Sequence, residues 1–313
     1  MMRMKRRTKI LYTIFTILTV VIFISLSGCT AKKDHNFRMA FLTDIHVQPE
    51  LKADLGLKQA ISKVNQLKPD FVITGGDLIM DALGQSEDRS IQLYDMYIDI
   101  SKDFQMPVYN TIGNHEVFGL YTKSGIDPQH AKYGKQMYKE RLGEGKTYYS
   151  FDKFGWHFII IDGIGYTDDR HYKGEVDDAQ LNWLKEDLAK VDPETPIMMS
   201  THIPFVSVMA QISKGGTAKL SDGLVITNSR EVLDLFEGHK LKLVLQGHLH
   251  IVEEIVFKDT HFITGGAVCG AWWKGDNAGF PEGFVMVDVN KDETFTWTYE
   301  TFGWQAVAED QGK

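Results

Sequence analysis

Short apolar runs alternate with amphipathic stretches from residue 37 to residue 250, and this alternation predicts a succession of strands and helices. Strands are expected where apolar residues fill a short run, at 37–43, 69–76, 107–113, 148–152, 156–162, 196–202 and 241–248. Helices are expected where apolar residues recur every three or four positions, at 55–67, 89–101, 177–191 and 228–238. The last of these has Thr227 or Asn228 as its candidate cap and Gly238 as its candidate end.

The pattern changes after residue 250. Four apolar runs, at 252–259, 261–266, 283–289 and 293–301, follow one another without helices between them. Two βαβ-like halves followed by a strand-rich tail predict an α/β fold, with two mixed sheets packed together and flanked by helices. Because no internal repeat or long linker divides residues 37–313, we expect this segment to form one domain.

Residues 1–29 have a pattern of their own. Five basic and no acidic side chains occupy residues 1–9, and 17 uncharged residues follow, from Ile10 to Leu26. This arrangement is typical of a secretory signal, and the ending Leu-Ser-Gly-Cys resembles the bacterial lipobox. We therefore predict a lipoprotein signal peptide at 1–28, a lipidated Cys29 and a short tether at 29–36. An uncleaved N-terminal anchor and a chance Cys29 are the alternatives.

The predicted location is extracytoplasmic, on a bacterial membrane, because both the lipoprotein and the uncleaved anchor tether the domain there. Five of the 34 basic side chains lie in residues 1–28, so the remainder carries 29 basic against 42 acidic side chains. This acidic balance does not suggest a nucleic-acid polymer as partner. Only two cysteines are present, which excludes a disulfide scaffold, and Cys269 is expected to be a small buried residue.

Five segments rich in Asp, His and Asn follow predicted strands. They are Asp44-Ile45-His46, Gly75-Gly76-Asp77, Gly113-Asn114-His115-Glu116, Thr201-His202 and Gly247-His248-Leu249-His250. The first two are common loop sequences when taken singly, whereas the last is rare by chance and the ordered set is rarer still. Strand ends form the usual ligand edge of an α/β sheet. Carboxylates, imidazoles and an amide without a thiolate suit a divalent metal such as Mn, Fe or Zn.

The identity and order of these segments resemble the calcineurin-like metallophosphoesterases over residues 37–290. The resemblance implies a four-layer αββα sandwich with a dinuclear metal site at the C-terminal ends of the strands. It implies that one metal binds Asp44, His46 and His250. It also implies that a second metal binds Asn114, His202 and His248, and that Asp77 bridges the two.

The same resemblance implies a reaction. A hydroxide that bridges the two divalent ions would attack a phosphomonoester or phosphodiester in line. His115 would approach the substrate and protonate or stabilise the leaving oxygen, and Glu116 would orient the His115 imidazole. The expected partners are therefore a small phosphoester substrate and, through the lipid anchor, a membrane.

Two residues distinguish branches of this family. Purple acid phosphatases place a metal-binding Tyr where this chain has Met80, and they lack the histidine that His46 supplies. The chain therefore resembles the bacterial phosphodiesterase-like branch more closely.

A glycine-rich stretch at 265–282 contains Trp272, Trp273 and Lys274, which are candidate substrate-binding residues. The tryptophans would stack on a base or a sugar and Lys274 would contact a phosphate. The alternative is that at least one tryptophan covers the edge of the core. Similar segments occur in calcineurin-like phosphoesterases.

Two other functions are alternatives to hydrolysis of a phosphoester. One is a surface binding lipoprotein with a structural or vestigial metal site, which the complete ligand set disfavours. The other is a different two-metal hydrolase such as an amidase, which the missing His-x-His-x-Asp-His pattern disfavours.

Overall fold

The computed structural model describes residues 36–307. The predicted signal peptide, the lipidated Cys29 and nearly all of the tether lie outside the described residues. Within the described part of the chain, no helix is both long and apolar enough to span a bilayer.

The first sheet has five strands in the order β13-β12-β1-β2-β3. Their bounds are β1 Phe37–Leu42, β2 Phe71–Thr74, β3 Val108–Tyr109, β12 Gly283–Val289 and β13 Phe295–Thr301. Strands β1, β2 and β3 are parallel, and β12 and β13 extend the sheet in antiparallel fashion. The sheet is therefore mixed, as predicted.

The second sheet has six strands in the order β10-β11-β9-β8-β5-β4. Their bounds are β4 Tyr149–Lys153, β5 Trp156–Ile160, β8 Pro196–Ser200, β9 Lys240–Gln246, β10 Val252–Phe257 and β11 Thr260–Gly265. The inner strands β11, β9, β8 and β5 are parallel, and the two edge strands are antiparallel. A separate hairpin pairs β6 Ile164–Tyr166 with β7 Tyr172–Gly174.

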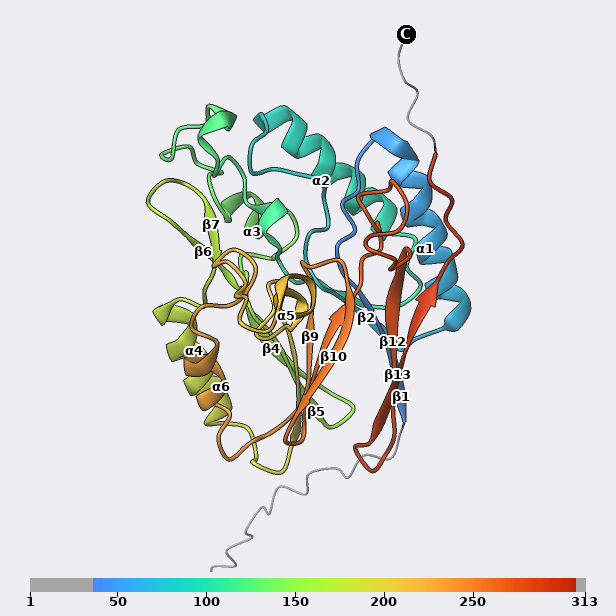
Figure 1. Cartoon of the computed structure of the whole chain (residues 1–313), viewed down its shortest axis with the longest axis vertical. Coiled ribbons are helices and arrows are strands. Elements are labelled where there is room, and N and C mark those ends of the chain that lie inside the picture. The colour runs from blue at the N-terminus through green and yellow to red at the C-terminus, as the bar shows by residue number, and fades with distance from the viewer. Residues whose placement is uncertain (1–35, 308–313) are drawn as a thin grey trace, which may run out of the picture. The chain divides into compact units, whose positions relative to one another are not determined.

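Alternation along the buried strands produces the layers. In β1, Met39 and Phe41 enter the core between the sheets, whereas Ala40 and Leu42 enter the core beneath α1 and α2. The helix bounds are α1 Ala53–Leu67, α2 Glu87–Ser101, α3 Gln136–Arg141, α4 Asp178–Leu188, α5 Met209–Lys214 and α6 Ser229–Asp234. Helices α1 and α2 flank the first sheet, and α4 and α6 flank the second (Figure 1). The predicted αββα sandwich is confirmed.

Helix α6 is shorter than the expected 228–238. It ends at Asp234, and turns lead from there to Gly238. Asn228 precedes the helix, but its side chain does not cap it. Its amide instead bonds both to the backbone nitrogen and to the carbonyl of Val176, so it joins two segments.

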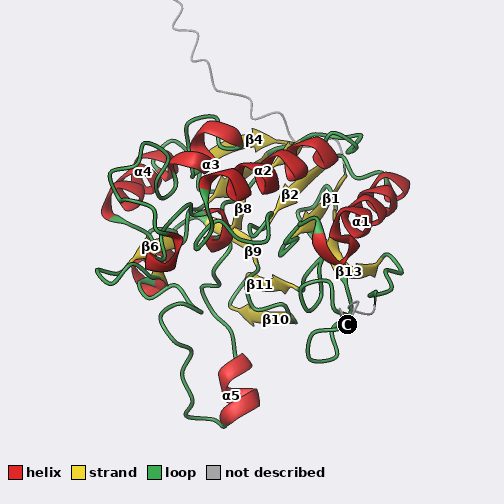
Figure 2. Cartoon of the chain, turned by 90° about the horizontal axis from the view of Figure 1, so that it is seen from above, coloured by secondary structure: helices red, strands yellow, loops and turns green. Residues whose placement is uncertain are grey.

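Several small elements carry no strong periodicity and were not predicted. They are α3, α5, the β6–β7 hairpin and the 3-10 turns η1 Glu50–Lys52, η2 Asn114–Glu116 and η3 Thr122–Ser124. Figure 2 shows α5 standing away from the sheets on the long connection between β8 and β9.

Candidate metal centre

The seven predicted ligands come from loops that follow β1, β2, β3, β8 and β9. Because parallel strands end at the same edge of a sheet, these loops meet. The backbone there is unusual: five of the seven ligands have positive φ, namely Asp44 (54°), His46 (48°), Asp77 (52°), His248 (73°) and His250 (53°). Residues other than glycine rarely adopt this region, and such strain clusters at functional sites.

Asp77 lies at the middle of the ligand set. Its Oδ2 atom is 3.5 Å from Nε2 of His46 on one side and 3.1 Å from Nε2 of His202 on the other. On the His46 side, Nε2 of His250 lies 3.2 Å from Oδ1 of Asp44. The structure therefore brings the Asp44, His46 and His250 side chains together around one edge of Asp77.

The other edge of Asp77 faces the remaining ligands. Nε2 of His202 lies 3.1 Å from Oδ1 of Asn114 and 3.1 Å from Nδ1 of His248. The two groups match the division into two metal sites that the resemblance implies. Among the described residues, Asp77 is the carboxylate that belongs to a candidate metal-binding group on each side.

Backbone carbonyls select which nitrogen of each ring faces the centre. Three rings donate to them: His202 Nδ1 to Gly75 O (2.7 Å), His248 Nε2 to Gly223 O (2.9 Å) and His250 Nδ1 to Gly270 O (2.7 Å). A ring that donates through one nitrogen presents the lone pair of the other nitrogen. The inward atoms are thus Nε2 of His202, Nδ1 of His248 and Nε2 of His250. No sequence motif indicated these carbonyls.

Gly76 makes the first of these contacts possible. Its φ is +86°, and a Cβ atom there would lie 2.8 Å from the ring of His202. Only glycine allows both the backbone conformation and the close approach.

The inward nitrogens fit bound cations. Nε2 of His46 and Nε2 of His250 face each other at 3.2 Å, and Nδ1 of His248 faces Nε2 of His202 at 3.1 Å. Two lone pairs that face each other at this distance repel unless a proton or a cation lies between them. Imidazole and carboxylate atoms arranged in this way suit divalent transition metals.

Protons can fill the same role when metals are absent. Burial raises the pKa of Asp44, but the charges on His250 and His202 outweigh burial and lower it to about 2. Burial lowers the pKa of His202, but Asp77 outweighs burial and raises it to about 9. Burial and the charge on His202 together lower the pKa of His248 to about 4. The carboxylates are therefore ionised and draw positive charge into the centre.

Glu116 does not orient His115, and the predicted role is wrong. Its buried carboxylate accepts four backbone N–H bonds, from Asp77 (2.9 Å), Leu78 (2.8 Å), Ile79 (3.1 Å) and Gly113 (2.7 Å). Burial and the charge on Asp77 raise the pKa of Glu116, whereas the backbone hydrogen bonds oppose that rise. Glu116 therefore fixes the loop that carries the bridging carboxylate.

His115 lies beside the centre and is held by a different group. Its Nδ1 atom bonds the backbone carbonyl of Met80, and its Nε2 atom lies 3.8 Å from Oδ2 of Asp77. The side chain is 22% exposed, whereas those of His46 and His202 are buried. Its ring centroid is 4.6 Å from that of His46. His115 thus reaches solvent next to the candidate ligand atoms.

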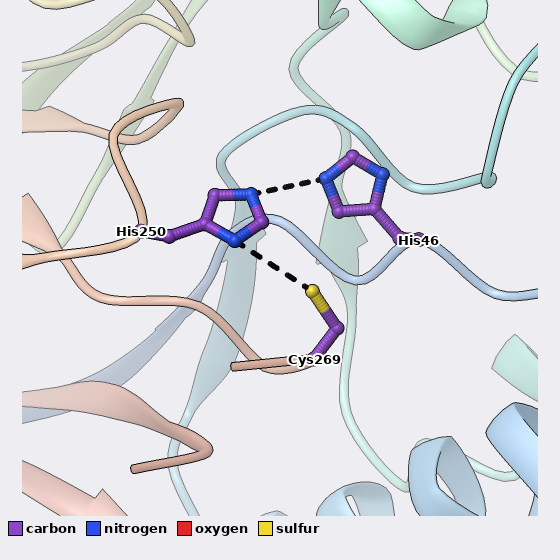
Figure 3. A group of neighbouring side chains, drawn as sticks. All are labelled: His46, His250 and Cys269. Carbon is purple, nitrogen blue, oxygen red and sulfur yellow. Dashed lines mark hydrogen bonds between the residues drawn. The ribbon is translucent and has the colours of Figure 1, made fainter. Parts of the chain in front are cut away.

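Cys269 lies behind His250 and is buried, as expected (Figure 3). Its Sγ atom is 3.9 Å from Nδ1 of His250, the nitrogen that also bonds the Gly270 carbonyl. The inward nitrogen of His250 is Nε2, the other nitrogen of the ring. The ligand atoms of His46, His250 and Cys269 nevertheless lie within 4.8 Å of one another, so the thiol is close enough to be a candidate ligand that the sequence did not indicate. Burial raises the pKa of Cys269, so the thiol is neutral.

The two tryptophans of the glycine-rich loop have different positions. Trp273 is fully buried, and its Nε1 atom donates to the backbone oxygen of His46 at 3.1 Å. Its predicted contact with substrate is wrong, because the ring belongs to the core. Trp272 is 41% exposed, and its ring lies 4.7 Å from that of His250. Lys274 is exposed at the surface.

Comparisons with known proteins give the same family as the motifs. The family model described as calcineurin-like phosphoesterase matches residues 37–252. Purple acid phosphatase 22 of Arabidopsis thaliana is 25% identical over 215 residues, which cover 66% of this chain and 45% of that protein. A probable cyclic nucleotide phosphodiesterase of Fibrobacter succinogenes (strain ATCC 19169 / S85) is 24% identical over 185 residues, which cover 57% of this chain and 60% of that protein. The chain thus spans about half the length of these relatives.

A solved structure shares the fold. A dimetal phosphatase from Danio rerio superposes with a TM-score of 0.58 at 14% identity, covering 80% of this chain and 95% of that one. At 14% identity this similarity supports the fold and nothing more specific.

Proposed function

The chain belongs to the calcineurin-like phosphoesterase family. From that premise we propose that it is a hydrolase that cleaves small phosphoesters on the outer side of a bacterial membrane. The observation that carries the proposed chemistry is the position of Asp77. Its Oδ2 atom lies within 3.5 Å of an imidazole from each half of the ligand set. A carboxylate in that position can serve two cations at once.

The proposed cofactors are two divalent ions, Mn, Fe or Zn. Asp44, His46 and His250 would hold one and Asn114, His202 and His248 the other, with Asp77 shared. When bound, the ions supply Lewis acidity toward phosphoryl oxygens and make water a nucleophile near neutral pH.

The chain's own residues would position and protonate the substrate. The carbonyl of Met80 holds Nδ1 of His115, so Nε2 is the atom directed toward the centre. From there it can donate a proton to the leaving oxygen of a monoester or a diester. The backbone bonds of Glu116 keep Asp77 in place while this happens.

The test is hydrolysis of p-nitrophenyl phosphate and bis-p-nitrophenyl phosphate by the purified chain with added Mn, together with metal analysis. We expect turnover and two bound ions, and Asp77→Ala is expected to lose both. Asp99→Ala, which removes an exposed carboxylate on α2, is the control and is expected to keep both. A fully active Asp77→Ala chain would contradict the proposed centre.

The proposed location rests on residues 1–29, which lie outside the described residues. The basic segment, the apolar run and Leu26-Ser27-Gly28-Cys29 support a lipoprotein signal. Metabolic labelling with a fatty acid is expected to mark the wild-type chain and not Cys29→Ser. Equal labelling of both would refute the lipid anchor.

A further inference from the structure

Trp272 exposes a large apolar ring directly beside the metal ligands. Its centroid lies 4.7 Å from the ring of His250, at an interplanar angle of 36°, and 6.2 Å from the ring of His46, at 53°. Both histidines are buried, whereas 41% of Trp272 is in contact with solvent. The indole therefore extends the surface of one half of the centre outward.

The backbone of this loop is strained at both tryptophans, whose side chains differ in burial. Trp272 has φ 52° and Trp273 has φ 68°, values that cost free energy for bulky residues. Core packing and the bond to His46 explain the position of Trp273. They do not explain why a second indole is turned out toward solvent beside the imidazoles.

Aromatic side chains border the other half of the centre as well. The ring of Tyr172 lies edge-on to His248 at 5.9 Å, and the ring of Tyr121 stacks on Tyr172 at 6.5 Å. Both tyrosines are only partly exposed. Trp272 is thus more accessible than either tyrosine.

We propose that Trp272 is a stacking platform for the organic group of the substrate, and that the site favours phosphoesters carrying a planar aromatic or heterocyclic group. The inference rests on the proposed phosphoesterase function. A phosphoryl group at the ligands has its ester substituent within reach of the indole. Stacking on an aromatic side chain raises affinity by about 5- to 150-fold per ring.

The test compares two non-hydrolysable ligands that share a phosphonate and differ in the attached group. Binding of phenylphosphonate and of methylphosphonate to the Mn-loaded full chain is measured by calorimetry. We expect wild type to bind phenylphosphonate about tenfold more tightly. Trp272→Ala is expected to reduce this preference to less than about twofold while two metals stay bound, and Trp272→Phe is expected to restore part of it.

Phe257→Ala is the matched control, because Phe257 is an aromatic residue 66% exposed at the far end of β10. It is expected to keep the wild-type preference. The stacking role of Trp272 would be contradicted if Trp272→Ala kept the wild-type preference for phenylphosphonate. It would also be contradicted if Trp272→Ala lost metal and bound both phosphonates equally weakly. If the chain prefers phenylphosphonate but hydrolyses no phosphoester, the proposed hydrolysis is contradicted and the stacking role of Trp272 is not. If the chain hydrolyses phosphoesters but shows no preference for phenylphosphonate, the stacking role is contradicted and the hydrolysis is not.

Discussion

The carboxylate of Glu116 accepts a 2.9 Å hydrogen bond from the backbone nitrogen of Asp77, the residue at the middle of the ligand set. Three further N–H groups converge on the same two oxygens, and the carboxylate is buried. Oxygen atoms are required on both branches of this side chain, because each branch receives two donors.

Glu116→Gln replaces one of those acceptors with a donor and is expected to destabilise the metal-free chain by about 2–5 kcal/mol. Urea unfolding measures the change. Glu87→Gln, at a partly exposed acid paired with Lys132 and His130, is the control and is expected to leave stability nearly unchanged. If Glu116→Gln had wild-type stability but an altered pH profile of catalysis, Glu116 would instead have the originally predicted role of orienting His115.

The sequence predicted which side chains the structure brings together because each candidate ligand lies in a loop that follows a strand, and strand ends are visible as apolar runs. The role of Glu116 was missed because its partners are N–H groups of a loop 37–39 residues away and of Gly113. Neither set of donors has a sequence signature. Trp272 and Trp273 are adjacent in one loop and have similar φ values, but tertiary packing and the bond to the His46 carbonyl place Trp273 in the core and leave Trp272 at the surface. Local pattern cannot distinguish them.

His115→Ala is expected to lower kcat by about 10²–10⁴-fold and to leave metal content unchanged. The reason is that the Nε2 atom of His115 points toward the centre but lies 3.8 Å from Asp77, while the side chain is 22% exposed. Steady-state kinetics and metal analysis on the same preparation measure the two effects. Loss of a metal in His115→Ala would show that His115 is itself a ligand.

Metal binding is expected to compete with a proton on His202. Its pKa of about 9 in the metal-free chain lies above the ordinary value near 6.5, because Asp77 outweighs burial. The protonated ring therefore stabilises the metal-free fold fully below pH 6.5, and this contribution is lost as the pH rises toward 9. Burial lowers the pKa of His250, but Asp44 outweighs burial and raises this pKa to about 12. His250 therefore stays protonated between pH 6.5 and 9 in the metal-free chain.

The Tm of the metal-free chain is thus expected to fall between pH 6.5 and 9, and the apparent affinity for Mn to rise over the same interval. Thermal unfolding with and without Mn measures the first, and calorimetry in buffers of different ionisation enthalpy measures the released proton. His202→Gln is expected to remove this pH dependence from the metal-free chain. If Tm changed with pH equally with and without Mn, the result would contradict a proton held on His202 in the metal-free chain.

Gly56→Ala tests the support that Trp273 gives to the metal centre. Alanine is normally the better helix former by about 1 kcal/mol, so intrinsic propensity predicts a more stable α1. A Cβ atom at Gly56 would lie 2.2 Å from Cζ3 of Trp273, whose Nε1 atom holds the backbone of His46. We therefore expect the opposite sign, a destabilisation of about 1–3 kcal/mol, together with weaker metal binding.

Gly216→Ala is the control for Gly56→Ala, since a Cβ atom there meets open space and the backbone φ is not in the left-handed region. Urea unfolding and Mn titration of both variants measure the two effects. A more stable Gly56→Ala chain with wild-type metal affinity would mean that Trp273 can shift without disturbing His46. A less stable chain whose metal affinity is unchanged would confine the role of Trp273 to packing against α1.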